Sequence, residues 1–236
     1  MKAGVLAGGK GTRLKKIFPN IPKSMIKIGG IPLIHRSVKI LLEAGIDQIG
    51  IVVPKNDKSI EQSFRDFFKK DIDLLFIEGK GINTITDFFQ LQSHISNSSF
   101  FVLMGDVLFL KRDFLRFKSF CIEKTDSSVV TAVTKFATIQ NAVSVLCKND
   151  HILDIDRKLK DKNLISAGIH YFPPTVFKWK SVYLNGGGTS ITGFMKLLMQ
   201  KEYRIYPFLF QTVIDINRLY EYQLAVKHSQ YFMNDI

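Results

Sequence analysis

Hydrophobic positions in the first half of the chain follow two alternating patterns. Continuous apolar runs predict buried strands at residues 3–7, 49–53, 74–77 and 100–104, with a shorter strand at 25–28. Between them, apolar side chains recur at helical spacing and predict helices at residues 32–45, 57–68 and 84–94. Strands that are apolar throughout belong in a parallel sheet covered on both faces by helices. The pattern therefore predicts an α/β fold with three layers, α/β/α, around a mixed, mostly parallel central sheet.

Residues at the ends of these segments support the helix assignments. Pro32 is suited to a helix start and Gly45 to a helix end, while Asp57 is an N-cap candidate for the second helix. Thr84 and Asp87 have the spacing of a capping box, which predicts that the third helix begins at Thr84.

The second half contains shorter strand-like runs. Strands are predicted at residues 128–134, 142–146, 151–155 and 164–171, and helices at 190–200 and 217–227. Neither an internal repeat nor a low-complexity linker separates the halves, so we expect one domain, 1–236, in which both halves share a sheet. The three glycines after Asn185 predict a flexible loop or lid.

Composition excludes several classes of protein. With 236 residues, of which 46% are hydrophobic and 23% charged, the chain suits one globular α/β domain. Cys121 and Cys147 form no disulfide framework, and neither a signal peptide nor an apolar run of about 18 residues is present. We therefore expect a cytoplasmic protein without membrane insertion. The net charge of +12 comes from dispersed Lys and Arg residues, so we expect no nucleic-acid partner.

A glycine-rich loop follows the first strand. It reads Leu6-Ala7-Gly8-Gly9-Lys10-Gly11-Thr12-Arg13-Leu14. Glycines let the backbone approach an anion closely, and successive N–H groups can then donate to phosphate oxygens. Arg13 can bind two such oxygens at once, and Lys10, Lys15, Lys16 and Lys23 add point charges. The loop is thus a candidate phosphate-binding loop, although a plain mobile Gly/Lys surface loop is the alternative.

Two familiar glycine motifs do not fit this loop. A P-loop requires Ser or Thr after the lysine, but Gly11 follows Lys10, and Gly4 lies inside the strand. The dinucleotide fingerprint requires a third glycine, whereas Arg13 and Leu14 follow Gly11.

The complete opening resembles that of the sugar-1-phosphate nucleotidylyltransferases. The resemblance rests on the loop, on Pro22-Lys23 and on the Gly-Gly turn and Pro-Leu-Ile of residues 29–34. It implies a Rossmann-like, GT-A-like nucleotidyltransferase fold and an enzyme that joins a nucleoside triphosphate to a sugar 1-phosphate, releasing pyrophosphate. The small-molecule partners would be bound by a nucleotide-binding half, about 1–110, and a sugar-phosphate-binding half, about 111–236. The resemblance leaves the oligomeric state open, a homo-oligomer included.

Two aspartates match the metal ligands of that family. Asp106 follows the apolar strand that in the family ends in Asn-Gly-Asp, and Asp215 matches the late Asp-x-Gly segment. The resemblance therefore implies that both bind Mg2+, which commonly binds to one or two carboxylates and to substrate phosphates. Met104 stands where the family has Asn, and Asn217 stands where it often has Gly. Without the resemblance, each aspartate reads as an ordinary strand-end residue.

Other segments match the family more loosely. Gly168 lies in a segment similar to Asn-Ala-Gly-Ile-Tyr, and either Arg157 or Lys158 falls where a lysine binds the sugar phosphate. The pair Asp154-x-Asp156 also spells a glycosyltransferase metal motif, but a solvent-facing strand edge explains it more simply. Residues 80–85 depart from the family's small residues at Asn83 and Thr84, so the base and the acceptor stay open.

The resemblance gives the following expected roles. Catalysis is expected from Arg13 and Lys23; nucleotide binding from Leu6, Ala7, Gly8, Gly9, Lys10, Gly11, Thr12, Gly81 and Asn83; substrate binding from Met104, Lys158 and Gly168; and metal binding from Asp106 and Asp215. Two alternatives are a CTP-dependent cytidylyltransferase for a non-sugar alcohol phosphate, such as phosphocholine or inositol phosphate, and a non-catalytic relative that binds nucleotide sugars.

Overall fold

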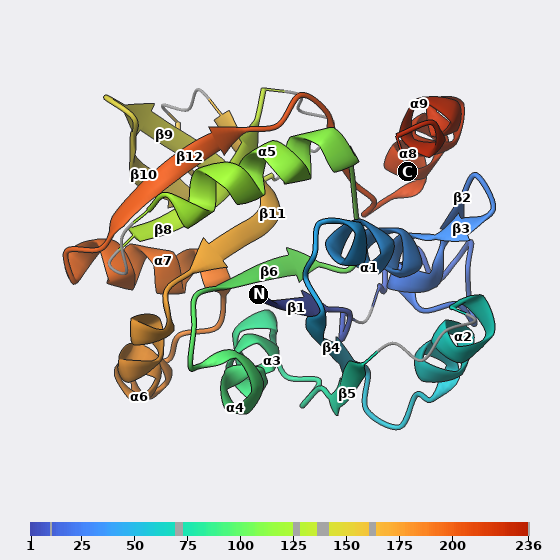
Figure 1. Ribbon diagram of the computed structural model, residues 1–236, viewed down its shortest axis with the longest axis horizontal. Coiled ribbons are helices and arrows are strands. Elements are labelled where there is room, and N and C mark those ends of the chain that lie inside the picture. Colours follow the sequence, from blue (N-terminus) through green and yellow to red (C-terminus); the bar gives the residue numbers. More distant parts are fainter. Residues whose placement is uncertain (10, 69–72, 125–127, 136–141, 161–163, 236) are drawn as a thin grey trace.

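A mixed β-sheet runs through the molecule (Figure 1). The computed structural model describes residues 1–9, 11–68, 73–124, 128–135, 142–160 and 164–235. Within these ranges nine strands form one sheet in the order β10-β9-β11-β6-β1-β4-β5, and β8 joins β11 to β12. The strands are β1 (Lys2–Leu6), β4 (Gln48–Val53), β5 (Leu74–Glu78), β6 (Phe100–Met104), β8 (Ser128–Thr134), β9 (Ser144–Lys148), β10 (His151–Asp156), β11 (Leu164–Phe172) and β12 (Arg204–Leu209).

Parallel pairing organises the N-terminal part of this sheet. Strands β5, β4, β1 and β6 are parallel neighbours, and β12 pairs in parallel with β8. Strand β11 pairs antiparallel with β6, β8 and β9, so it connects the two halves of the chain. The predicted sharing of one sheet by both halves is confirmed.

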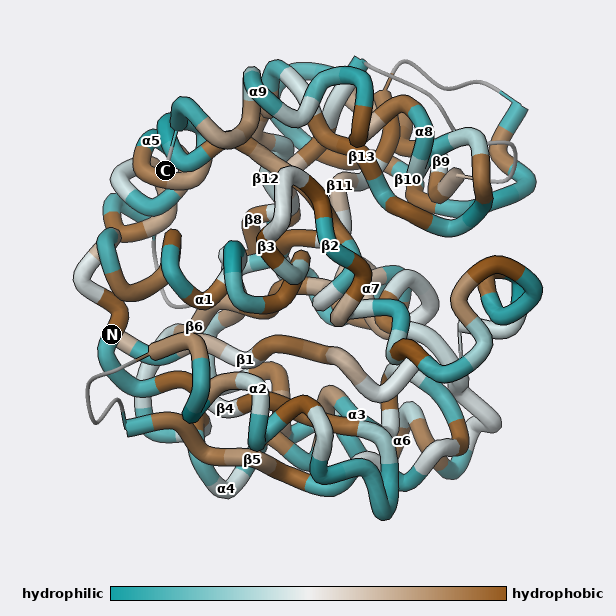
Figure 2. Tube along the Cα trace, turned by 90° about the vertical axis from the view of Figure 1, so that its right-hand side faces the viewer, coloured by the Kyte–Doolittle hydropathy of each residue, from teal (hydrophilic) through white to brown (hydrophobic). Residues whose placement is uncertain are grey.

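Helices cover both faces of the sheet. They are α1 (Leu33–Glu43), α2 (Ser59–Phe67), α3 (Thr84–Gln90), α4 (Gln92–Ile95), α5 (Lys111–Ile122), α6 (Lys180–Asn185), α7 (Ile191–Gln200), α8 (Leu219–Lys227) and α9 (Ser229–Met233). Figure 1 shows α1 and α5 in front of the sheet. Hydrophobic stretches follow the inner strands, including β1, in Figure 2.

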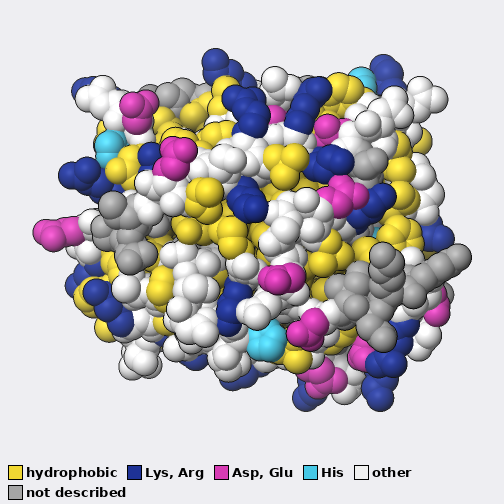
Figure 3. Space-filling view, viewed as in Figure 1, with side chains coloured by type: hydrophobic (Ala, Val, Ile, Leu, Met, Phe, Trp, Pro, Cys, Tyr) yellow, Lys and Arg dark blue, Asp and Glu magenta, His cyan; other side chains and the backbone are white. Residues whose placement is uncertain are grey.

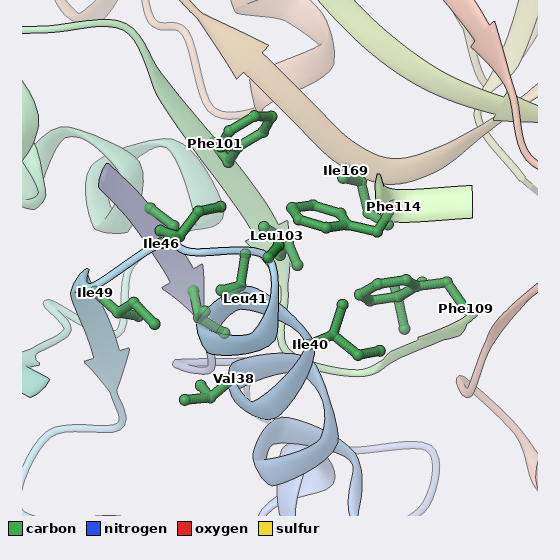
Figure 4. Close-up of a cluster of buried hydrophobic side chains, with 14 of the residues drawn as sticks. Val38, Ile40, Leu41, Ile46, Ile49, Phe101, Leu103, Phe109, Phe114 and Ile169 are labelled. Carbon is green, nitrogen blue, oxygen red and sulfur yellow. The ribbon is translucent and has the colours of Figure 1, made fainter. Parts of the chain in front are cut away.

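Successive residues of β6 belong to opposite cores, because side chains alternate along a strand. Phe101 and Leu103 pack in the cluster that contains the apolar faces of α1, α2 and α5 (Figure 4). Phe100 and Val102 pack in the cluster formed with α3, α4 and α7. The predicted three-layer α/β architecture is therefore confirmed.

A third, smaller core supports the loops above the sheet. It lies beneath two short ladders, β2 (Lys27–Ile28) with β3 (Ile31–Pro32) and β7 (Val107–Phe109) with β13 (Val213–Asp215). Buried Arg36 donates to the carbonyl oxygens of Phe109 at 2.8 Å and Phe232 at 2.7 Å. These bonds fix α1 to β7 and to α9.

Several predicted boundaries need correction. The capping box of α3 uses Asn83 and Thr86, so the helix is capped one residue before the predicted Thr84. Leu91 separates α3 from α4, whereas one helix was predicted. Helix α2 starts at Ser59, and Asp57 accepts from the Ser59 backbone N–H at 2.9 Å instead of serving as the N-cap.

Two surface features bear on the expected partners. On the face that Figure 3 shows, Lys and Arg side chains are scattered among acidic ones. No helix in the described part of the chain is long and apolar enough to cross a membrane.

The three glycines after Asn185, predicted as a flexible loop or lid, follow the end of α6. The Tyr183 hydroxyl donates to the Ser190 carbonyl oxygen at 2.8 Å and so bridges this segment.

Candidate active site

The sheet order brings the glycine-rich loop beside Asp106. Strands β1 and β6 are parallel, with Leu6 opposite Met104, so the loops that follow them leave the same edge of the sheet. The backbone N–H of Gly105 donates to the Leu6 carbonyl oxygen at 2.9 Å. A Cβ on Gly105 would lie 3.1 Å from that oxygen and 3.3 Å from Cα of Ala7. Glycine at this position thus permits the close approach of the two loops.

Asp106 and Asp215 lie side by side although they are distant in sequence. Strand β7 begins directly after Asp106 and pairs antiparallel with β13, placing Val107 opposite Asp215. The Ile216 backbone N–H donates to the Asp106 carbonyl oxygen at 3.2 Å. The two predicted metal ligands are therefore brought together at one end of the β7–β13 ladder.

Lys23 connects both carboxylates. Its Nζ forms an ion pair with Asp106, lies 3.7 Å from Oδ1 of Asp215, and donates to Oδ1 of Asn217 at 2.6 Å. Burial lowers the pKa of Lys23, but the charges of the two aspartates outweigh this effect, so its pKa is raised. The ammonium group consequently keeps its charge in this nearly buried place.

The glycine-rich loop passes close to Lys23. Gly11 has a φ of +55°, which favours glycine, and a Cβ there would lie 3.0 Å from Cβ of Lys23. The loop and the Pro22-Lys23 segment therefore lie next to the two aspartates. We call Lys23 and its three side-chain partners, Asp106, Asp215 and Asn217, the Lys23 cluster.

The carboxylates of this region carry excess negative charge. Burial and, after it, the charge of Asp106 raise the pKa of Asp215 to about 6, against the opposing effect of Lys23. The Oδ1 atom of Asp215 is buried and has no hydrogen-bond partner, and the same holds for Oε2 of nearby Glu221. These unfilled acceptors suit an additional cation.

The donor set fits a magnesium ion. In the described residues no group of three or more His, Cys, Asp and Glu side chains could hold a metal, and the candidate ligands are the two carboxylates that Lys23 joins, Asp106 and Asp215. Magnesium is commonly held by one or two carboxylates, with waters and substrate phosphates as its other ligands. Asp106 and Asp215 are thus sufficient for an ion that a phosphate-bearing substrate helps to bind.

The remaining loop residues are held at both ends and exposed between them. Ala7 donates its N–H to the Val52 carbonyl oxygen at 2.8 Å, and Leu14 is buried in the third core. Leu6 and Ala7 are buried, Gly8 is half-buried, and Gly9, Thr12 and Arg13 are exposed; Lys10 lies outside the described residues. Among the described residues no hydrogen bond or ion pair is found between Arg13 and the Lys23 cluster.

Met104 and Gly168 meet beside Asp106. Gly168 has a φ of +68° and lies where the pairing of β11 with β8 is irregular. A Cβ on Gly168 would lie 3.0 Å from Cγ of Met104 and 3.4 Å from Cγ2 of Val107. Both residues therefore lie close in the fold to Asp106, and their substrate-binding roles stay predictions.

The predicted phosphate-binding residue Lys158 follows the end of strand β10. It is exposed in the turn after β10, and its backbone N–H donates to Oδ1 of Asp156 at 2.9 Å. Asp154 and Asp156 both form ion pairs with Lys196, at 3.3 and 2.6 Å. Both carboxylates of the Asp154-x-Asp156 pair are therefore bound by Lys196 of α7.

The segment after β5 contains Gly81 and Asn83, the two residues predicted there to bind the nucleotide. Gly81 is exposed with a φ of +66°, and Oδ1 of Asn83 accepts from the Thr86 backbone N–H at 3.0 Å as the cap of α3.

The sequence analysis did not assign two neighbours of the site, Asn217 and Asp87, to it. A signal for Asn217 was its position, a polar residue two places after the predicted metal ligand Asp215. Asp87 was assigned to the capping box of the third helix instead.

Comparison with known proteins agrees with this geometry. Residues 2–222 match the family model described as nucleotidyl transferase. The bifunctional protein GlmU of Methanococcus aeolicus is 29% identical over 181 residues, which cover 75% of this chain and 41% of that relative. The chain thus spans less than half the length of this relative.

Solved structures with the same fold differ in their substrates. The inositol-1-phosphate CTP transferase from T. maritima has a TM-score of 0.83 at 20% identity, covering 96% of this chain and 95% of its own. A UDP-glucose pyrophosphorylase from Acinetobacter baumannii has a TM-score of 0.80 at 19% identity, covering 96% and 92%. At these identities the likeness establishes the fold alone. Because the family model matches nearly the whole length of this chain, the chain belongs to the nucleotidyl transferase family, that of the sugar-1-phosphate nucleotidylyltransferases.

Proposed function

We propose that this protein transfers a nucleotidyl group from a nucleoside triphosphate to a sugar 1-phosphate, giving a nucleotide sugar and pyrophosphate. The observation that carries the proposal is the Lys23 cluster, where a nearly buried lysine joins two aspartates beside a glycine-rich loop. Family membership supports the same reaction class.

The chemistry of this reaction suits such a cluster. A phosphate oxygen of the acceptor must attack the α-phosphorus of the triphosphate, so two anions have to meet. Catalysis then depends on positioning and on the neutralisation of charge, with little need for covalent chemistry by the protein. A nearly buried lysine that stays charged is appropriate for this task.

Each residue has a proposed role in this reaction. Lys23 neutralises the phosphate under attack, while Arg13 and the N–H groups of residues 8–13 bind the triphosphate and the departing pyrophosphate. Asp106 and Asp215 would hold Mg2+, which when bound supplies positive charge to the phosphates. Met104 and Gly168 would form the wall next to the acceptor.

A second candidate acceptor has support from the comparisons. One solved structure with this fold is described as an inositol-1-phosphate CTP transferase, so a CTP-dependent enzyme for a non-sugar alcohol phosphate is an alternative. Met104 and Asn83 depart from the sugar enzymes at positions expected to contact substrate. A non-catalytic relative is less well supported, because Arg13, Lys23 and both aspartates are all present.

The proposal extends to the cellular setting. We assign the protein to the biosynthesis of nucleotide sugars for polysaccharides, in the cytoplasm, where nucleoside triphosphates are available.

A pyrophosphate-release screen tests the proposed function. Purified protein with Mg2+ is incubated with CTP, GTP, UTP and TTP against a panel of sugar 1-phosphates and alcohol phosphates. We expect release that requires both substrates and stops when a chelator is added. A panel without any acceptor-dependent release would contradict the proposal, and release with an alcohol phosphate alone would favour the second candidate.

A further inference from the structure

A buried carboxylate lies between the glycine-rich loop and the segment after β5. Asp87, in the first turn of α3, is only 5% exposed. Its Oδ1 accepts from the Lys80 backbone N–H at 3.2 Å, and a Cβ on Gly79 would lie 3.0 Å from that oxygen. On the other side, a Cβ on Gly8 would lie 2.6 Å from Oδ2. The carboxylate thus contacts both segments to which nucleotide binding is assigned.

The burial of this carboxylate is compensated at Oδ1 by the hydrogen bond from the Lys80 backbone N–H. Burial raises the pKa of Asp87, and the Lys80 backbone N–H only partly opposes the effect. Among the described residues no Lys or Arg forms an ion pair with it. A buried acceptor of this kind is costly unless it receives hydrogen bonds. A ligand that brings a donor to Oδ2 would therefore be favoured over one that brings another acceptor.

The geometry points to Asp87 as a specificity-determining residue that accepts a hydrogen bond from an amino group of the nucleobase. The inference rests on the proposed function and narrows it to a nucleoside triphosphate whose base carries an exocyclic amino group. Carboxylates accept from the amino group of cytosine, whereas uracil and thymine present a carbonyl oxygen at the same ring position. Two facing acceptors repel each other, so Asp87 selects against UTP and TTP.

Matched nucleotide pairs test this inference. CTP and UTP differ at C4, amino against carbonyl, and at N3, which carries a proton in uracil only. GTP differs from ITP only by its amino group. The wild-type protein should have a higher kcat/KM for the amino-bearing member of the pair that fits its pocket. Asp87→Asn keeps an oxygen for the Lys80 N–H but can place an amide donor at the position of Oδ2. We expect it to lower the CTP-to-UTP or GTP-to-ITP ratio by about tenfold or more.

A control variant separates recognition from a structural role. Asp73→Asn removes the same charge from an exposed position next to β5, and it should leave the ratios unchanged. Binding of each nucleotide to Asp87→Asn, measured by calorimetry, provides a readout that does not require turnover. Equal losses for both members of a pair would mean that Asp87 only supports the loop, and would overturn the inference.

The failures of the two proposals are distinguishable. A wild-type protein that turns over UTP or TTP better than the amino-bearing nucleotides contradicts the role of Asp87, but the proposed function stands. Absence of turnover with every nucleotide and acceptor contradicts the proposed function itself, and the inference that depends on it.

Discussion

Asp106 and Asp215 share one cation, the Nζ of Lys23, although they are 109 positions apart in sequence. The β7–β13 ladder accounts for this closeness, since it pairs Val107 with Asp215 and bonds Ile216 to the Asp106 carbonyl oxygen. The third core beneath the ladder holds it in place.

Removal of the Lys23 charge should damage catalysis more than folding. We expect Lys23→Ala to reduce kcat by about 100-fold or more, because it removes a preorganised positive charge at the phosphate under attack. Steady-state pyrophosphate release measures the effect. Lys27→Ala, which removes an exposed lysine of β2, serves as the matched control and should retain activity. A Lys23→Ala enzyme with unchanged kcat would remove the lysine from the mechanism.

Asn217 should position the Lys23 ammonium group. Its Oδ1 accepts from Nζ at 2.6 Å, and hydrogen bonds to charged groups contribute about 1.5–3 kcal/mol. Asn217→Ala should therefore lower kcat by about tenfold while KM for the triphosphate changes little. The exposed Asn20 provides the control substitution. An effect confined to KM would show that Asn217 binds substrate and does not act through Lys23.

Buried histidine should make stability depend on pH. Burial lowers the pKa of His170 to about 4, below its ordinary value of 6.5. The unfolded chain takes up a proton below pH 6.5 while the folded one does not, so stability present above pH 6.5 is lost as pH falls toward 4. The slope for one such group is at most about 1.4 kcal/mol per pH unit.

Denaturant unfolding between pH 7.5 and 4 measures this dependence. His170→Asn can keep a hydrogen bond to Thr131, whose Oγ1 lies 3.2 Å from Nδ1 of His170, and it should flatten the decline in the free energy of unfolding. His228→Asn, at an exposed position, should leave the slope as in the wild type. Identical slopes for wild type and His170→Asn would mean that another group controls the pH dependence.

The sequence predicts those parts of the fold that local pattern determines. Strands β6 and β8 lie at the predicted residues because continuous apolar runs suit a sheet covered on both faces. Helix α5 was not predicted, although its buried Phe114, Phe117 and Cys121 recur at helical spacing. The exact start of α3 depends on which side chain caps it, a choice between neighbouring polar residues that a pattern does not decide.

Contacts between distant side chains are the part that sequence alone does not supply. The proximity of Asp106 and Asp215 follows from the family resemblance, but the bond from Lys23 to Asn217 joins residues 194 positions apart and requires the folded ladder. The ion pairs of Lys196 with Asp154 and Asp156 likewise arise from the packing of α7 against β10. The catalytic and binding roles assigned to these residues stay predictions.

The most direct test of the account is turnover by Asp106→Asn, Asp215→Asn and the double variant under saturating Mg2+. Each single variant should lose nearly all product formation, and the double variant should be little worse than either, because residues that act as one unit have non-additive effects. Thermal unfolding of all three checks that the fold is intact. Independent losses that multiply in the double variant, or full activity in the presence of a chelator, would contradict a shared metal site at Asp106 and Asp215.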